Sequence, residues 1–166
     1  MLDLNNTLFH HLSAAYSDDM DMKGALINRR LEFYDYVSYD VLDGEGAEEW
    51  VSLRVGDVID MKEEEEEDAF AIVRAIFCHM ANNTNRYVFL IIDWFQATGN
   101  KDELLECPYY KLHDPEEVQW RRIYPISFVD HASSTHFIHH CTRHCTNMHD
   151  RNSRLYLRND FFYNTV

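Results

Sequence analysis

The chain has few of the residues that build flexible or covalently stapled proteins. Its 166 residues include only five glycines, three prolines and four cysteines, while 46% of the residues are hydrophobic. Four cysteines are too few for a disulfide framework in a chain of this length, so we expect them to be thiols or metal ligands in a reducing compartment. The composition excludes a disordered or fibrous protein and predicts one globular domain with a packed core.

The chain also lacks a long apolar run. No stretch approaches the roughly 20 consecutive apolar residues that a membrane-spanning helix needs. The first residues, Met-Leu-Asp-Leu-Asn-Asn, have neither the basic start nor the apolar run of a secretion signal. We therefore expect a soluble, intracellular protein with no membrane partner.

Basic side chains are scarce as well. Fifteen lysines and arginines stand against 29 aspartates and glutamates, which gives a formal net charge of −14. This charge opposes nonspecific nucleic-acid binding and favours a basic partner. Six arginines nevertheless gather in residues 121–158: Arg121, Arg122, Arg143, Arg151, Arg154 and Arg158. They either pair with acidic residues of the same domain or form a basic face that binds nucleic acid, and both alternatives stay open.

Signatures of catalysis are missing too. The chain has no glycine-rich phosphate loop and no Gly-x-Ser-x-Gly elbow, and its carboxylates form no recognisable acid and base pair. The sequence thus predicts a protein that is not an enzyme.

Short β-branched and aromatic runs are abundant instead. Three of them lie at residues 51–61, 70–77 and 87–95, an aromatic run at 27–41 precedes them, and 155–163 ends the series. Runs of this length without helical periodicity between them are typical of antiparallel strands. Asp43-Gly44 predicts a tight hairpin turn, and the five glutamates at 63–67 indicate an exposed loop, or alternatively a docking site for a lysine-rich tail.

The first residues differ from the rest, because Leu4, Leu8, Leu12 and Ala15 recur at helical spacing. They indicate a short docking helix, with a disordered tail as the alternative. The predicted fold is therefore mainly β, a small antiparallel barrel-like domain with a short N-terminal helix and a His/Cys-rich C-terminal segment. We predict a helical extension and linker over 1–26 and the β domain over 27–166, with the His/Cys-rich segment at 131–166.

Six of the ten histidines and two of the four cysteines lie between residues 131 and 149. Zinc prefers four tetrahedral nitrogen or sulfur ligands. Cys141, Cys145 and His149 are spaced four apart, so one helical face would present all three, with His140, or alternatively His139 or His136, completing a closed structural site. The alternatives are buried thiols beside a polar loop, or a catalytic metal with an open coordination position.

The segments Arg54-Val55-Gly56-Asp57-Val58, Ile72-Val73-Arg74-Ala75-Ile76 and a strand ending in Trp94-Phe95 follow one another in a familiar order. In this order the chain resembles the bromo-adjacent homology domain over roughly residues 30–140. The family continues after the tryptophan with Arg-Pro and acidic residues, whereas this chain has Gln-Ala-Thr-Gly-Asn at 96–100. The resemblance implies a β-rich, chromatin-associated module in the nucleus.

Some members of that family grip a methylated lysine with aromatic side chains through cation–π contacts. The candidate binding residues here are Tyr34, Trp50, Trp94, Tyr109 and Tyr110. Tyr36, Tyr39 and Phe95 belong to the same wider set of aromatics, and the alternative is that these side chains serve the core. We predict a non-enzymatic module that binds a basic protein such as a histone tail. The alternatives are a metal-dependent enzyme at the His/Cys cluster and a nucleic-acid binder that uses the C-terminal arginines.

Overall fold

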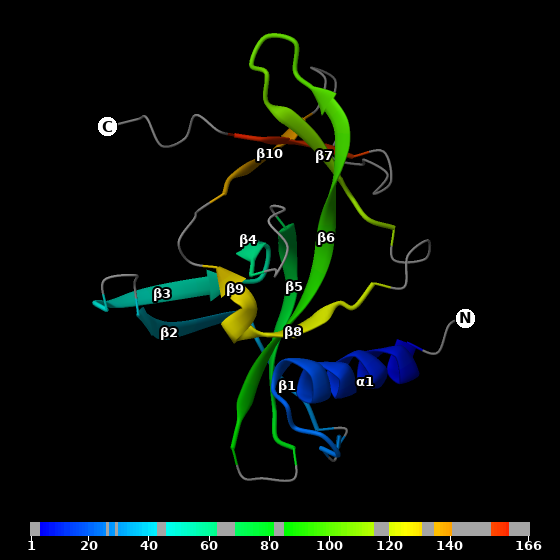
Figure 1. The fold of residues 1–166 in the computed structure, drawn as a ribbon, viewed down its shortest axis with the longest axis vertical. Coiled ribbons are helices and arrows are strands. Elements are labelled where there is room, and N and C mark those ends of the chain that lie inside the picture. Colours follow the sequence, from blue (N-terminus) through cyan, green and yellow to red (C-terminus); the bar gives the residue numbers. More distant parts are fainter. Residues whose placement is uncertain are drawn as a thin grey trace. The chain divides into compact units, whose positions relative to one another are not determined.

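The computed structural model describes residues 4–25, 27–28, 30–42, 46–62, 69–81, 85–114, 120–130, 135–140 and 154–159. The described chain is mainly β, with one short N-terminal helix (Figure 1). The predicted fold class, an antiparallel barrel-like β domain with a short helix, is confirmed at this level. The His/Cys-rich end of that prediction lies largely outside the described residues.

The helix α1 spans Leu4–Ala14 and continues into the π-helical turn η1, Ala15–Asp19. The strands that follow in the first half are β1 Glu32–Tyr34, β2 Tyr36–Leu42, β3 Glu48–Arg54, β4 Val58–Met61 and β5 Ala69–His79. The second half holds β6 Tyr87–Lys101, β7 Pro108–Leu112, β8 Ile123–Pro125, the 3₁₀ turn η2 Ile126–Phe128, β9 Val129–Asp130, β10 Phe137–His140 and β11 Leu155–Arg158.

The described strands form one large antiparallel sheet and one separate ribbon. The order in the large sheet is β10-β11-β7-β6-β5-β4-β9, with β1 paired to β5 and β8 paired to β6. The ribbon consists of β2 and β3 alone, paired from Tyr36 opposite Arg54 to Leu42 opposite Glu48. This pairing is the one expected for two strands joined by the Asp43-Gly44 turn, although residues 43–45 are outside the described chain.

Two predicted strands are each interrupted once. The run predicted at 51–61 is two strands, because Gly56 has a φ of +100° and turns the chain between β3 and β4. A bend at Asp35 likewise divides β1 from β2 within the run predicted at 27–41. A continuous strand in either place is therefore wrong, and the breaks free β2 and β3 to pair with each other outside the large sheet.

The chain separates into two compact units. The first comprises 1–57, 73–92 and 121–129, and the second comprises 58–72, 93–120 and 130–166. The first unit's core contains Leu12, Ala15, Tyr16, Phe77, Phe89 and Ile123, so α1 packs as the docking helix that its leucine spacing predicts. Figure 1 shows the blue helix beside β8, with which it is in contact. The second unit's core contains Phe70, Phe95, Tyr110 and Leu112.

Candidate functional site

An open groove in the first unit is lined by aromatic and aliphatic side chains together with two charged ones. Its lining runs along the β1–β2 bend and includes Phe33, Tyr34, Asp35, Tyr36, Val55 and Arg74. The volume is about 660 Å³, which lies within the range of ligand-binding clefts. Phe33 is 59% exposed and Tyr36 is 61% exposed. The groove therefore presents aromatic surface to solvent.

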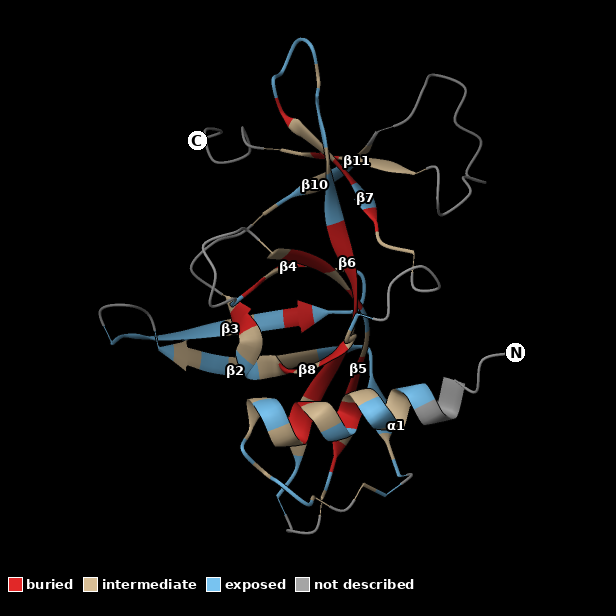
Figure 2. Cartoon of the chain, turned by 45° about the vertical axis from the view of Figure 1, so that its right-hand side comes forward, coloured by how far each residue is buried: buried red, intermediate tan, exposed pale blue. Residues whose placement is uncertain are grey.

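The groove adjoins the β2–β3 ribbon, because Tyr36 and Ser38 of its lining are also members of the ribbon. Alternate residues of paired strands share one face. We call the more exposed face of the ribbon the ribbon face; Figure 2 shows much of β3 in the pale blue of exposed residues. Its members form four cross-strand pairs: Tyr36 with Arg54, Ser38 with Ser52, Asp40 with Trp50, and Leu42 with Glu48. Trp50 is 68% exposed and Leu42 is 72% exposed. Two large apolar side chains thus stand in solvent on a strand pair with no covering element among the described residues.

The opposite face of the ribbon is better protected. Val37, Tyr39 and Leu53 lie there, and Leu53 is buried. Burial raises the pKa of Tyr39 to about 12, because the phenolate loses solvation on this side. The alternation in burial fixes the ribbon's register, so Tyr36 and Trp50 cannot turn inward without exposing Val37 and Leu53.

Acidic residues dominate this part of the chain. Residues 32–57 contain eight aspartates and glutamates and a single basic residue, Arg54. On the ribbon face, Asp40 lies directly opposite Trp50, and Glu48 opposite Leu42. Residues directly opposite on an antiparallel pair have Cβ atoms about 4.5–5.5 Å apart. A cation over the indole ring of Trp50 would therefore be near a carboxylate.

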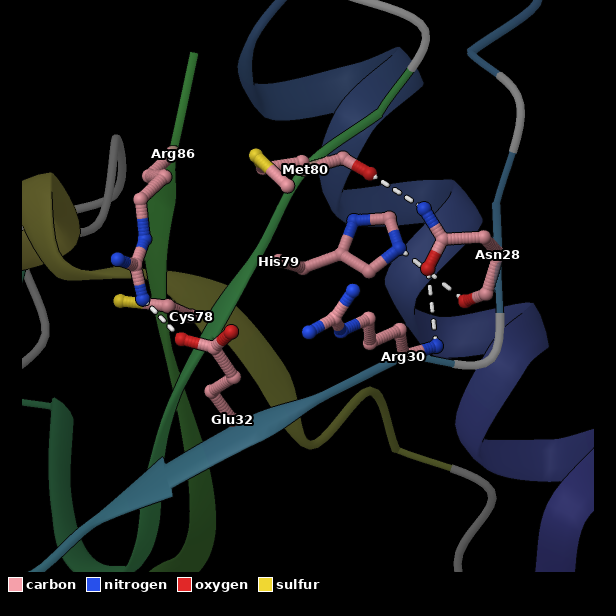
Figure 3. Close-up of a pocket in the computed structure, with 7 residues that line it drawn as sticks. All are labelled: Asn28, Arg30, Glu32, Cys78, His79, Met80 and Arg86. Carbon is pink, nitrogen blue, oxygen red and sulfur yellow. Dashed lines mark hydrogen bonds and ion pairs between the residues drawn. The ribbon is translucent and has the colours of Figure 1, made fainter. Parts of the chain in front are cut away.

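A second, smaller pocket lies on the same unit (Figure 3). It is lined by Asn28, Arg30, Glu32, Cys78, His79, Met80 and Arg86 and has a volume of about 30 Å³. This is room for about one or two water molecules. Its polar groups are engaged in the fold: the Asn28 amide donates to the Met80 carbonyl at 2.8 Å, and Arg86 pairs with Glu32. The pocket is a structural feature and offers no room for a peptide or cofactor.

His79 anchors the helix to this region. Its Nε2 lies 3.2 Å from the Asn28 carbonyl oxygen, which can only accept, so Nε2 carries the proton. Nδ1 then accepts the hydrogen bond from the Tyr16 hydroxyl at 2.7 Å. Burial lowers the pKa of His79, and the hydrogen bond to the Asn28 carbonyl opposes that shift. The neutral imidazole satisfies both partners, which is the role of a core histidine.

The five predicted binding aromatics have different positions. Tyr34 lines the groove, and its hydroxyl donates to Glu32 at 3.1 Å and accepts from Arg86 at 2.8 Å, two residues that line the smaller pocket. Trp50 lies on the ribbon face. Trp94 and Tyr110 are buried in the second unit, and the Tyr109 hydroxyl donates to Asp102 at 2.7 Å in that same unit. Only Tyr34 and Trp50 therefore belong to the surface that the groove and the ribbon face form.

Phe33 and Leu42 also contribute to that surface and were not candidates from the sequence, whereas Tyr36 was one of the wider set of candidate aromatics. A signal for Leu42 was present, because it has the same parity in β2 as Tyr36 and Asp40. The exposure of Phe33 had no such signal, since it follows from the bend at Asp35.

The predicted metal ligands are mostly outside the described residues. His140 ends β10, where its backbone pairs with Leu155 of β11, while Cys141, Cys145 and His149 are not described. Within the described ranges, no three histidine, cysteine or acidic side chains form a group that would hold a metal ion. Zinc at the His/Cys cluster stays a prediction.

Several C-terminal arginines have structural partners. Arg121 donates to both carboxylate oxygens of Asp19 at 2.7 Å, and its guanidinium lies 4.0 Å from the centre of the Tyr124 ring. Arg122 donates from Nε to the Ile92 carbonyl, and Arg158 lies over the Phe70 ring in the second unit. The pairing of Arg121 with Asp19 matches the alternative in which these arginines engage their own domain.

Comparison with protein-family models and with curated proteins finds no match for this chain. In the described part of the chain, no helix has the length and apolar character required to cross a membrane. The resemblance to the bromo-adjacent homology domain accordingly stays a prediction based on the sequence segments.

Proposed function

We propose that this chain is a non-enzymatic protein-interaction module in which the ribbon face and the adjoining groove bind a basic segment of another protein. The observation that carries the proposal is Trp50, which is 68% exposed and directly opposite Asp40. An indole ring attracts lysine and arginine side chains through cation–π interaction. A nearby carboxylate adds charge attraction and a hydrogen-bond acceptor.

The whole-chain charge supports the same class of partner. A net charge of −14 attracts basic chains over distances beyond direct contact. Exposed aromatic side chains supply the apolar anchor that charge alone does not. A histone tail belongs to this class of partner, and the sequence resemblance is the reason to propose chromatin and the nucleus in particular.

The test is binding of a short fluorescent peptide of alternating lysine and serine, measured by anisotropy. We expect saturable binding by the unmodified chain and no binding of the same peptide with glutamate in place of lysine. Trp50→Ala should weaken affinity by about 5- to 30-fold, since a cation–π contact is worth about 1–2 kcal/mol where it is desolvated.

Trp120→Ala is the matched control. Trp120 is also exposed, at 46%, but lies in the second unit beside His113 and Trp94. Its replacement should leave the affinity unchanged. Equal losses in both variants, or no binding by the unmodified chain, would overturn the proposal.

A further inference from the structure

The two ends of the ribbon face differ in chemistry. At one end, Trp50 lies beside Asp40, and the next pair along the same face is Leu42 with Glu48. No basic side chain belongs to these two pairs. At the other end, Tyr36 lies opposite Arg54 and borders the groove, whose lining includes Phe33, Val55, Asp35 and Arg74.

Each end therefore selects a different side chain. Asp40 and Glu48 make the Trp50 end attractive to a lysine or arginine. At the groove end, the charged residues of the lining are Asp35 and Arg74, one of each sign, so a cation gains little there. The exposed apolar surface of Phe33, Tyr36 and Val55 instead favours an apolar side chain.

The register sets the distance between the two ends. The pair Asp40–Trp50 lies four residues along the strands from the pair Tyr36–Arg54. At about 3.3 Å per residue this is a separation of about 13 Å. The pair between them, Ser38–Ser52, has small side chains, so nothing large stands between the two aromatic anchors.

An extended peptide matches this spacing. Its side chains on one face recur every second residue, about 6.6 Å apart, so residues i and i+4 span the two ends. Residue i+2 would lie over the serine pair, where a small side chain fits. Residues at odd spacings point to opposite faces of the peptide and cannot both reach the ribbon face.

We infer that the partner segment binds in an extended conformation and carries a lysine or arginine four residues from an apolar side chain. The basic side chain lies at Trp50 and Asp40, and the apolar side chain lies in the groove beside Tyr36 and Phe33. This inference rests on the proposed function and adds the order and spacing of the recognised residues.

The test uses a host peptide of serine and threonine that contains one leucine and one lysine. The lysine is placed two, three, four, five or six positions along the sequence from the leucine, so that the four-residue spacing corresponds to residues i and i+4. Both orders of leucine and lysine are made, because an extended peptide can run in either direction along the face. We expect one order at the four-residue spacing to bind at least about tenfold more tightly than the odd spacings. The spacings of two and six residues should also bind more weakly.

A pair of charge variants tests which end takes the lysine. Asp40→Asn should reduce affinity for the four-residue peptide severalfold and diminish its preference for lysine over norleucine. Glu49→Gln is the control, since Glu49 is an exposed acid on the same ribbon that pairs with Val41 on the opposite face. Glu49→Gln should leave unchanged both the affinity for the four-residue peptide and the preference for lysine over norleucine.

Different results would overturn the spacing of the recognised residues and the proposed function. Equal affinity at all spacings, with a continued loss in Trp50→Ala, would overturn the spacing inference and leave the proposed function standing. Absence of binding by every host peptide and by the lysine and serine peptide would overturn both. Equal effects of Asp40→Asn and Glu49→Gln would overturn the assignment of the lysine to the Trp50 end.

Discussion

At the scale of single residues, the same aromatic side chain serves two different purposes in this chain. Tyr16 is fully buried, bonded to His79, and packed edge to face against Phe89 with ring centres 5.0 Å apart. Tyr36 is 61% exposed. Composition cannot separate these roles, since burial depends on which face of its element each residue occupies.

His79 provides a residue-scale prediction about pH. Because burial lowers its pKa, the unfolded chain binds more protons than the folded chain below the ordinary histidine pKa of about 6.5. Its contribution to the free energy of unfolding is therefore complete above that value and is lost as the pH falls. We expect stability, measured by urea denaturation, to decrease from about pH 7.5 to about pH 5.

The variant His79→Gln separates this effect from that of other histidines. Burial also lowers the pKa of His11 and of His113, so they contribute to the same trend. The variant should lose about 1–3 kcal/mol at neutral pH, because the buried Tyr16 hydroxyl loses its short hydrogen bond to Nδ1, and should show a flatter pH dependence. Parallel stability curves for the variant and the unmodified chain would contradict the role given to His79.

At the scale of elements, periodicity located the strands around 70–77 and 87–95 better than it located their ends, and β7, Pro108–Leu112, was not among the predicted runs. The strand expected at 70–77 is β5, Ala69–His79, and the strand expected at 87–95 continues to Lys101 as β6. The polar residues at the end of β6 hid its length, since they pair with β7 while their side chains face solvent. The helix was predictable because Leu8 and Leu12 share one packed face.

The break between β3 and β4 gives a prediction at this scale. A Cβ atom at Gly56 would meet no atom within 4 Å, so Gly56→Ala tests the backbone alone. At a φ of +100° a side chain strains the backbone, and we expect a loss of about 1–3 kcal/mol in the free energy of unfolding. Ser52→Ala, in the adjoining exposed part of β3, should change it by less than about 0.5 kcal/mol. If Gly56→Ala and Ser52→Ala changed the free energy of unfolding by equally small amounts, the turn would not need glycine at position 56.

The segment between β10 and β11 carries the prediction about zinc. We expect purified protein without a histidine tag to contain one equivalent of zinc and to melt at a lower temperature after treatment with a strong chelator. Cys145→Ser should remove the metal, whereas Cys78→Ser, in the first unit, should leave it bound. Protein without metal, and a melting temperature indifferent to chelator, would reduce the cluster to a polar loop.

At the scale of the whole molecule, the net charge and the mainly β class could be predicted from the sequence, whereas the separate ribbon could not. The net charge of −14 already favoured a basic partner. The candidate surface needed two facts that only coordinates supply: the bend at Asp35 and the turn at Gly56, which remove β2 and β3 from the large sheet. Trp50 was a candidate from sequence because it is aromatic, and its exposure follows from its place on the ribbon face.

The most direct test of the central claim is a map of backbone amide chemical shifts during titration with the lysine and serine peptide. The account predicts that the largest changes fall in residues 33–42 and 48–55, which contain the groove aromatics and both strands of the ribbon. The second unit's exposed Trp120 and Leu104 should show little change. Changes concentrated in the second unit, or spread evenly over acidic residues of both units, would contradict a binding site on the ribbon face.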